Sequence, residues 1–454
     1  MIALLLSLAL QAPAPLAPAP DFAALEEVAR AELAETGTPG AAIAVIQGGR
    51  AIYGKGLGVA NIETGAPVTP TTLFHIGSLT KLMTAAAIVS EAEAGRLKLD
   101  QPVGDLVAGL APKLAKLTLH QLLSQTSGLK ETPGEDGLHG EEALGAWVRS
   151  LKDEDLLVPP GTAFSYSNNG YALAGLALEA ETGKPYAEAM EKALFQPMGM
   201  PRTTLRPTVA MTFPLAMGHT AKEKQPPTVV RPLADDTRLW PAGYAFTNLE
   251  DLARFVIALL NGGRVNGRQG MPPGVPAKLL ASHVEIPTNV FVRGAYGYGL
   301  FLQDDRGLRR AEHGGELPGY GAEIRLFPEK KVGVIVLVNR EGVRLNKTFD
   351  KAFDLFAGPA TPRENRTAPE LPMTEAERAA VVGKYENRWP MDVFVRDNRL
   401  FLRRFGAELP IIRVGENRYS VTDGGRQQEF LIMPAKDGNP GYMQMFIWVF
   451  RKTG

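Results

Sequence analysis

The sequence predicts an α+β fold followed by a small all-β domain. Three observations lead to this prediction. Short apolar runs typical of hairpins lie near both ends of the first 357 residues, helical apolar spacing dominates between them, and short strand-like runs follow a Pro-rich boundary. We expect an antiparallel sheet flanked by helices, with a large helical subdomain, and then a C-terminal barrel or curled sheet.

The N-terminal part of the first domain predicts a helix and a hairpin. Asp21 can cap a helix over 22–35, which Gly37 would stop. Two apolar runs at 41–46 and 51–59 are joined by Gln-Gly-Gly-Arg, which is typical of a turn. We therefore expect a helix followed by two antiparallel strands.

The C-terminal part of this domain predicts a second hairpin and a helix. Runs at 321–327 and 332–338 flank the turn-forming segment 328–331, and helical spacing returns after Arg344. The intervening stretch from Thr80 to Leu260 is mainly helical in pattern. Helices packed on an antiparallel sheet follow from this order.

A Pro-rich polar stretch marks the boundary between two domains. We assign 21–357 to the first domain, 358–373 to a linker, and 374–454 to a barrel-like β domain. Seven short strands are expected in this last domain, at 383–385, 391–395, 399–403, 408–414, 419–422, 428–433 and 443–450.

Composition and charge exclude several classes of protein. The 454 residues are 45% hydrophobic and include 49 basic and 49 acidic side chains, so nucleic-acid binding is not expected. The absence of cysteine excludes disulfides, thiolate metal sites and a cysteine nucleophile. No cluster of metal-ligating residues stands out in the sequence, and no cofactor is expected.

Residues 1–20 resemble a secretory signal with an Ala-Pro spacer behind it, although no Lys or Arg precedes the apolar run. The apolar run is too short to span a bilayer, and no second run of about 20 apolar residues follows, so no integral membrane domain is expected. We expect a secreted or periplasmic protein. Oligomeric state cannot be read from the sequence.

The segment Ser78-Leu79-Thr80-Lys81 is the first candidate for chemistry. It lies where an extended run, 73–77, gives way to a long apolar helix that reaches about Gly95. Residues three apart share a helical face, so the Ser78 hydroxyl would meet the Lys81 amine. A nucleophile would then lie beside a base, near backbone N–H groups that suit an oxyanion. Ser127 and Lys130 repeat the spacing, but Gly128 should end the preceding helix.

Tyr166-Ser167-Asn168 is the second candidate, in a loop before a helical run at 171–181. The Tyr166 phenol could exchange protons if nearby ammonium charge lowered its pKa, and the Asn168 amide could hold a substrate carbonyl or the lysine. Tyr385 and Asn387 repeat the spacing in the C-terminal β region, where a strand is expected rather than a loop. We therefore favour Tyr166 and Asn168 as the functional pair.

His313-Gly314-Gly315-Glu316 is the third candidate, on or beside the strand that precedes the second hairpin. Gly314 and Gly315 would let a substrate lie against the strand backbone, and His313 could donate a hydrogen bond or supply partial positive charge near neutral pH. Each motif also has a purely structural interpretation, as a helix cap, a polar turn and a glycine turn. The three motifs in this order are stronger evidence for a catalytic site than any one of them alone.

Together these three motifs resemble those of the serine β-lactamase and penicillin-binding superfamily, and the Tyr-x-Asn form resembles its class C branch. Flanking phrases at 122–129, 160–171 and 241–255 agree with this resemblance. It covers about 21–357 and implies a β-lactamase/transpeptidase-like fold for this part of the chain.

The resemblance also implies roles for individual residues. Ser78 would be the acylated nucleophile, and Lys81 with Tyr166 would shuttle its proton. Asn168 would orient Lys81 and the substrate, and the backbone N–H groups of Ser78 and Glu316 would form the oxyanion hole. His313 would stand where the family often has the lysine of its Lys-Thr-Gly motif, and Gly314 would lack the threonine hydroxyl. Relatives with this histidine include esterases, D-amino-acid-specific peptidases and other amide hydrolases.

We therefore expect a serine hydrolase that cleaves a small ester, amide or peptide-like substrate through an acyl-enzyme on Ser78. Three alternatives remain: a penicillin- or muropeptide-binding sensor that acylates without efficient turnover, a class C β-lactamase, and a non-catalytic interaction protein. An α/β-hydrolase is disfavoured because no Gly-x-Ser-x-Gly elbow is found. The C-terminal β domain either borders the active site and narrows substrate access or is an independent binding module.

Overall fold

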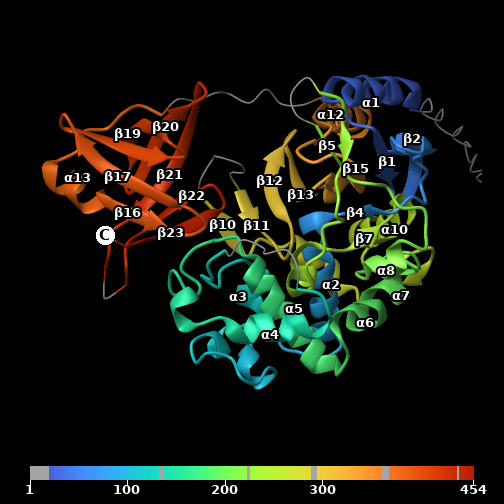
Figure 1. Ribbon diagram of the computed structural model, residues 1–454, viewed down its shortest axis with the longest axis horizontal. Helices are drawn as coiled ribbons and strands as arrows, with labels where there is room; N and C mark the ends of the chain where they lie inside the picture. The colour runs from blue at the N-terminus through green and yellow to red at the C-terminus, as the bar shows by residue number, and fades with distance from the viewer. Residues whose placement is uncertain are drawn as a thin grey trace, which may run out of the picture.

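The computed structural model describes residues 20–131, 138–221, 225–287, 294–359, 368–436 and 439–453. A nine-stranded antiparallel sheet forms the larger part, and a closed eight-stranded barrel, orange and red in Figure 1, forms the smaller part. This arrangement confirms the expected α+β class with a separate all-β domain. Residues 1–19 of the signal-like segment and 360–367 of the expected linker lie outside the described residues.

The sheet has the strand order β10-β11-β12-β13-β14-β15-β1-β2-β3. The first and last hairpins of the domain meet at its centre, where Ala44 of β1 lies opposite Ile335 of β15. Both predicted hairpins are confirmed. The strands are β1 Gly40–Gln47, β2 Arg50–Asn61, β3 Ala66–Pro67, β10 Val284–Ile286, β11 Gly294–Tyr296, β12 Phe301–Asp305, β13 Leu308–Leu317, β14 Tyr320–Phe327 and β15 Val332–Val338.

Two helices from opposite ends of the domain cover one face of the sheet. Asp21 caps α1 by accepting hydrogen bonds from the N–H groups of Ala23 and Ala24, and Gly37 ends it at a φ of 63°. The predicted first helix is therefore confirmed as α1 Phe22–Thr36, and the predicted helix after Arg344 as α12 Asn346–Phe356. Figure 1 shows them side by side above the sheet.

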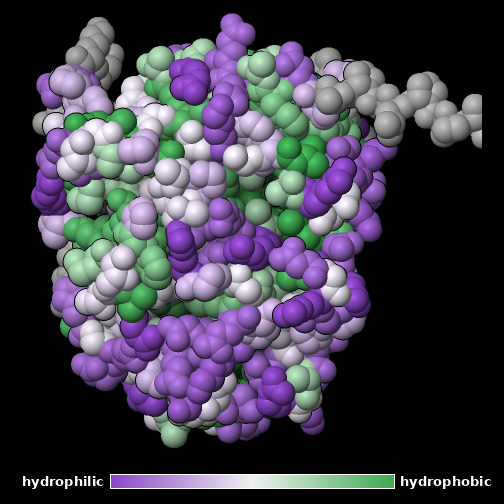
Figure 2. Space-filling model, turned by 90° about the vertical axis from the view of Figure 1, so that its right-hand side faces the viewer, coloured by the Kyte–Doolittle hydropathy of each residue, from purple (hydrophilic) through white to green (hydrophobic). Residues whose placement is uncertain are grey.

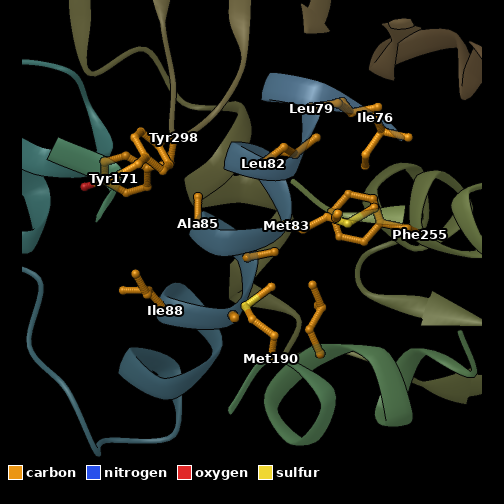
Figure 3. Close-up of a cluster of buried hydrophobic side chains, with 14 of the residues drawn as sticks. Ile76, Leu79, Leu82, Met83, Ala85, Ile88, Tyr171, Met190, Phe255 and Tyr298 are labelled. Atoms are coloured by element: carbon orange, nitrogen blue, oxygen red, sulfur yellow. The ribbon is translucent and has the colours of Figure 1, made fainter. Parts of the chain in front are cut away.

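The other face of the sheet packs on the large helical subdomain, as expected. Buried side chains on all sides of α2 contact neighbouring helices, including Tyr171 of α5 on one side and Phe255 of α10 on the other (Figure 3). The helices here are α2 Thr80–Glu93, α3 Leu119–Leu123, α4 Glu142–Ser150, α5 Asn168–Thr182, α6 Tyr186–Met190, α7 Gln196–Met198, α8 Pro207–Ala210, α9 Trp240–Gly243, α10 Leu249–Leu260 and α11 Gly274–Leu280.

The C-terminal barrel contains one more strand than the sequence predicted. We expected a single strand over 443–450, but β22 and β23 are joined by a turn at Phe446 and Ile447. The prediction was wrong because these turn residues are apolar, whereas turns are usually polar. Both side chains are partly buried: Phe446 packs against the barrel core, and Ile447 packs against a cluster that includes Tyr166. The helix α13 Glu375–Val381 precedes β16 Gly383–Glu386, β17 Pro390–Arg396, β18 Arg399–Arg404, β19 Ala407–Gly415, β20 Arg418–Asp423, β21 Arg426–Met433, β22 Tyr442–Met445 and β23 Trp448–Lys452.

The surface alternates between polar and apolar residues on the side shown in Figure 2, where apolar residues form patches separated by polar and charged ones. Within the described ranges, no helix is both long enough and apolar enough to cross a membrane. The expectation about residues 1–20 is not addressed by this finding.

Candidate active site

Ser78 lies on the single 3-10 turn Gly77–Leu79, directly before α2. The helix therefore begins two residues later than the sequence suggested, and it ends at Glu93 rather than near Gly95. The predicted pairing is nevertheless present, because the Lys81 Nζ lies 3.3 Å from the Ser78 Oγ. Continuous winding from the 3-10 turn into α2 keeps the two side chains on one side.

The Lys81 side chain is fully buried and has three hydrogen-bond partners. Besides Ser78, its Nζ donates to the Asn168 Oδ1 at 2.5 Å and to the Ala242 carbonyl oxygen at 2.6 Å. The Nζ also lies 4.6 Å from the centre of the Tyr166 ring. Burial lowers the pKa of Lys81 from 10.5 to about 7, and the Glu131 carboxylate opposes this decrease. A substantial fraction of Lys81 is therefore uncharged at neutral pH.

Tyr166 is buried, and it lines the same cavity as Ser78. A phenol pKa lowered by nearby ammonium charge was the condition set for proton exchange by Tyr166. The structure does not meet this condition, because burial raises the pKa of Tyr166 well above 10 and outweighs the opposing effect of the Ser78 side chain. Tyr166 is therefore a neutral phenol across the physiological range.

Asn168 is the first residue of α5, and Ser167 caps this helix by accepting a hydrogen bond from the Gly170 N–H at 3.2 Å. Both interpretations of the motif therefore hold at once: Ser167 is a helix cap, while Asn168 contacts Lys81. The cap fixes the backbone from which the Asn168 amide extends.

Two glycines allow β13 to approach Ser78 closely. A Cβ atom on Gly315 would lie 1.8 Å from the Ile76 carbonyl oxygen and 2.8 Å from the Ser78 nitrogen, and one on Gly77 would lie 2.4 Å from the Glu316 nitrogen. Gly77 also has a φ of 50°. Only glycine fits at both positions. This contact brings the backbone nitrogens of Ser78 and Glu316 to the same small region.

One side of β13 is open beside Ser78. Strand β12 pairs with β13 only as far as Glu312, which lies opposite Phe301. In the described part of the chain, residues 313–317 of β13 therefore have no strand partner on that side. Gly314 and Gly315 lie in this open segment.

His313 is on β13, as predicted, but its charge differs from the expectation. Burial lowers the pKa of His313 to about 3, so the ring is neutral at pH 7 rather than partly charged. Its Nδ1 donates to the Gly314 carbonyl oxygen at 2.6 Å, and its Nε2 lies 3.4 Å from the Tyr296 hydroxyl. His313 therefore offers neither positive charge nor a free Nδ1–H to a ligand.

A cavity of about 360 Å³ joins these residues. Ser78, Tyr166 and 313–316 line it, so the structure brings together six of the eight predicted site residues around one space. Lys81 lies buried behind Ser78, and Asn168 lies behind Lys81. The described residues contain no group of three or more His, Cys, Asp and Glu side chains arranged to hold a metal ion.

Sequence reasoning missed the contribution of the barrel to this cavity. Ile447 of the β22–β23 turn and Trp448, the first residue of β23, line the cavity together with Phe301. The Tyr166 N–H donates to the Ile447 carbonyl oxygen at 2.7 Å, so the barrel turn is attached directly to the second motif. Two adjacent apolar residues at a turn were the available signal. Of the two expectations for the barrel, the structure favours the one in which it borders the cavity.

Sequence reasoning also missed Arg344 and Glu131. The Arg344 guanidinium lies 3.4 to 3.5 Å from where a Cβ on Gly314 would sit, and it lines the cavity. Glu131 is buried and accepts two hydrogen bonds from Asn168, at 2.7 and 2.6 Å. No sequence pattern marks either residue, because each reaches the site through tertiary contacts.

The two repeated patterns do not form a second site. Lys130 pairs with Asp155 at 2.7 Å instead of with Ser127. Tyr385 lies on β16 and is buried in the barrel, as expected for a strand residue. Asn387, however, follows this strand in a loop, and its Oδ1 accepts a hydrogen bond from the Glu131 N–H at 3.0 Å.

The family of the chain follows from comparison with known proteins. Residues 25–356 match the family model described as Beta-lactamase, so the chain belongs to the β-lactamase family. The resemblance and the serine-hydrolase or penicillin-binding-protein type of fold are thereby confirmed for this region.

Two relatives match over most of this region. Penicillin-binding protein 4 of Amycolatopsis lactamdurans is 29% identical over 364 residues, which cover 75% of this chain and 94% of that protein. Protein flp of Staphylococcus aureus (strain N315) is 28% identical over 326 residues, which cover 69% of this chain and 62% of that protein. The match therefore spans less than two thirds of the length of Protein flp.

Two solved structures share the fold. SurE matches with a TM-score of 0.79 at 22% identity, over 95% of this chain and 99% of that chain, so the likeness includes the barrel. A class C β-lactamase mutant matches with a TM-score of 0.60 at 23% identity, over 73% of this chain and 95% of that chain.

Proposed function

We propose that this protein is a serine hydrolase that cleaves a small ester or amide, including peptide-like amides, through an acyl-enzyme on Ser78. The observation that carries the proposal is the hydrogen bonding of Lys81. A neutral amine has two N–H groups and one lone pair, and the two shortest contacts of its Nζ, to Asn168 and Ala242, use the two N–H groups. The lone pair is then left for the Ser78 hydroxyl.

The first chemical step follows from this arrangement. Lys81 takes the Ser78 proton as the Ser78 Oγ bonds to the substrate carbonyl carbon, and the carbonyl electron pair moves to its oxygen. We assign stabilisation of this oxyanion to the N–H groups of Ser78 and Glu316, and the close approach of β13 to Gly77 and Ser78 supports this assignment. When the oxyanion collapses, the leaving group departs and takes the proton from Lys81 through the neutral Tyr166 phenol. Water then attacks the acyl carbon and gives up a proton to Lys81. The bond between the acyl carbon and the Ser78 Oγ breaks, Lys81 returns the proton to Ser78, and the acid is released.

The cavity supports a preference for small substrates with an apolar part. Phe301, Ile447 and Trp448 form an apolar side, while Arg344 supplies a cation near Gly314. A neutral His313 does not supply the fixed positive charge that binds a β-lactam carboxylate in relatives with lysine there. We therefore expect lower activity on β-lactams than on esters and other amides.

The test is turnover of p-nitrophenyl butyrate by purified protein. Ser78→Ala should lower kcat by about 10⁴-fold or more, because no other group supplies the nucleophile. Ser150→Ala, at an exposed position, is the matched control and should retain activity. A Ser78→Ala variant with undiminished turnover would defeat the proposal. A parallel panel of D-amino-acid amides and a chromogenic cephalosporin would rank the substrate classes.

A second candidate is a penicillin- or muropeptide-binding sensor, which the likeness to Penicillin-binding protein 4 favours. A sensor would acylate on Ser78 and deacylate slowly, so a burst of p-nitrophenol without steady turnover would support it. Labelling by a fluorophosphonate, mapped by mass spectrometry to Ser78 rather than Ser127, distinguishes both candidates from a non-catalytic protein.

We also propose export of the protein, on the basis of the signal-like residues 1–20. Fractionation of cells expressing the full chain should place it outside the cytoplasm. Retention of the full-length chain in the cytoplasm would contradict this.

A further inference from the structure

We propose that Glu131 is a positioning residue for Asn168 and Lys81, and that Asn387 of the barrel holds Glu131 in place. The proposal rests on the function proposed above. It assigns a role to a residue outside the three motifs and connects the barrel to the reaction.

Glu131 fixes the orientation of the Asn168 amide. Its Oε2 accepts a hydrogen bond from the Asn168 backbone N–H at 2.7 Å, and its Oε1 accepts one from the Asn168 Nδ2 at 2.6 Å. A carboxylate only accepts hydrogen bonds, so the amide NH₂ must face Glu131 and the amide oxygen must face Lys81. Rotating the amide by 180° would place an oxygen against a carboxylate and an NH₂ group against the Lys81 amine.

The orientation matters because the Asn168 Oδ1 occupies one N–H of Lys81 at 2.5 Å. With a second N–H bonded to the Ala242 carbonyl, the amine cannot rotate its lone pair away from Ser78 without breaking a bond. Glu131 therefore acts on Ser78 through two intervening side chains.

Glu131 also sets the charge balance of the buried site. The titratable groups facing Lys81 are Glu131, Tyr166 and Tyr171 on or beside α5, and His313 on β13, while Arg388 of the barrel acts on Glu131. Burial keeps both tyrosines and His313 neutral near pH 7. Burial raises the pKa of Glu131, and the hydrogen bonds from Asn168 and the charge of Lys81 oppose this increase. In its ionised form, Glu131 is the group that favours the protonated form of Lys81.

The segment that leads to Glu131 is held on two sides. On one side, the Leu157 N–H donates to the Gly128 carbonyl oxygen at 2.8 Å, and the Lys130 N–H donates to the Asp155 carbonyl oxygen at 2.8 Å. The second Ser-x-x-Lys pattern, 127–130, therefore forms the hydrogen-bonded segment that leads directly to Glu131.

On the other side, the barrel holds the backbone of Glu131. The Glu131 N–H donates to the Asn387 Oδ1 at 3.0 Å, and the Asn387 Nδ2 donates to the Val449 carbonyl oxygen at 2.8 Å. Val449 directly follows Trp448, which lines the cavity. The Asn387 side chain therefore links the segment that contains Glu131 to strand β23, which begins beside the cavity.

Kinetics of Glu131→Gln test the proposal. This variant keeps the size of the side chain but loses its charge and one of its acceptors, so kcat should fall by about 10- to 100-fold with little change in KM. Glu131→Asp keeps the charge but shortens the reach, so kcat should fall while the pH dependence stays near that of the wild type. Glu154→Gln, with a side chain 70% exposed, is the matched control. Asn387→Ala should lower kcat in the same direction by a smaller factor.

Titration of Lys81 gives a readout that does not depend on turnover. In protein labelled with ¹³C at the lysine ε-carbons, the signal that titrates near pH 7 and disappears in Lys81→Met belongs to Lys81. Glu131→Gln should move this titration down by about one pH unit, because the neighbouring negative charge is lost, whereas Glu131→Asp should leave it nearly in place. An unchanged titration in a folded Glu131→Gln protein would overturn the proposal, even if the wild type proves to have no hydrolase activity. A shifted titration without hydrolysis would overturn only the proposed function.

Discussion

The Lys81 amine is buried in the candidate site without an ion-pair bond among the described residues, which disfavours its charged form. Burial lowers its pKa to about 7, which is where a general base works best at neutral pH. Local helical geometry determines its contact with Ser78, so this part of the site was predictable from four residues of sequence.

The pH dependence of kcat/KM follows from this pKa. Activity should rise with pH and level off above about 7, since only the unprotonated Lys81 accepts the Ser78 proton. The measurement is kcat/KM for p-nitrophenyl butyrate between pH 5 and 8.5, with spontaneous hydrolysis subtracted. A profile that is flat through pH 7 would exclude Lys81 as the base.

Stability should also depend on Lys81. The pKa of Lys81 is about 7 in the folded protein and 10.5 when unfolding exposes the side chain. Between these pH values, unfolding takes up a proton. The wild type therefore gains stability as the pH rises through this window. Relative to Lys81→Met, the wild type should gain about 1.4 kcal/mol per pH unit there. Denaturant unfolding of both proteins at pH 6.5 and 9.5 measures this, and an equal difference at the two pH values would contradict it.

The charge of His313 could not be predicted from its residue type alone. The position of this residue on a strand was predictable, but its charge was not, because the charge depends on burial among Tyr296, Phe301 and Tyr166. Tyr166 lies far in sequence from Tyr296 and Phe301, so these neighbours meet around His313 only in the folded chain.

At the scale of elements, the close approach of β13 to the turn before α2 brings the backbone of the site together. A Gly315→Ala substitution would place a Cβ atom 1.8 Å from the Ile76 carbonyl oxygen, so one of the two elements must move. We expect a loss in kcat/KM of at least about 100-fold, because displacements near 1 Å cost about that much.

The matched control for this prediction is Gly54→Ala on β2. An added Cβ there would lie 3.8 Å from the nearest atom, a Leu249 methyl, so activity should be retained. Circular dichroism and thermal unfolding would show that both variants fold. Full activity in a folded Gly315→Ala protein would show that the close approach is unnecessary for turnover.

Hairpins and capped helices were the predictable elements, because their signals are local. Asp21 with Gly37, and the turns at 47–50 and 328–331, each act within a few residues. The turn at Phe446 and Ile447 was missed because turns are recognised by polar and glycine residues. In this turn, Phe446 packs against the barrel core and Ile447 packs against the larger domain.

At the scale of the molecule, the barrel closes the cavity of the larger domain. Trp448→Ala should enlarge the apolar side of the cavity and raise kcat/KM for p-nitrophenyl octanoate relative to the acetate by about 10-fold. Phe405→Ala, at a barrel side chain that is 70% exposed, is the control. An unchanged ratio in Trp448→Ala would mean that the barrel turn does not limit the size of the acyl group.

The sequence by itself determined the class of fold, both central hairpins, the separate all-β domain and the three motifs that surround Ser78. These features depend on local periodicity, capping and helical spacing, which a chain carries within short windows. Only the tertiary structure decided the charges of the site, namely the low pKa of Lys81 and the neutral ring of His313. It also decided two contacts: Glu131 hydrogen-bonds Asn168, and barrel residues line the cavity. The physical reason is that burial and charge depend on residues far apart in the chain, such as Glu131 and Asn387, which become neighbours only after the two domains pack.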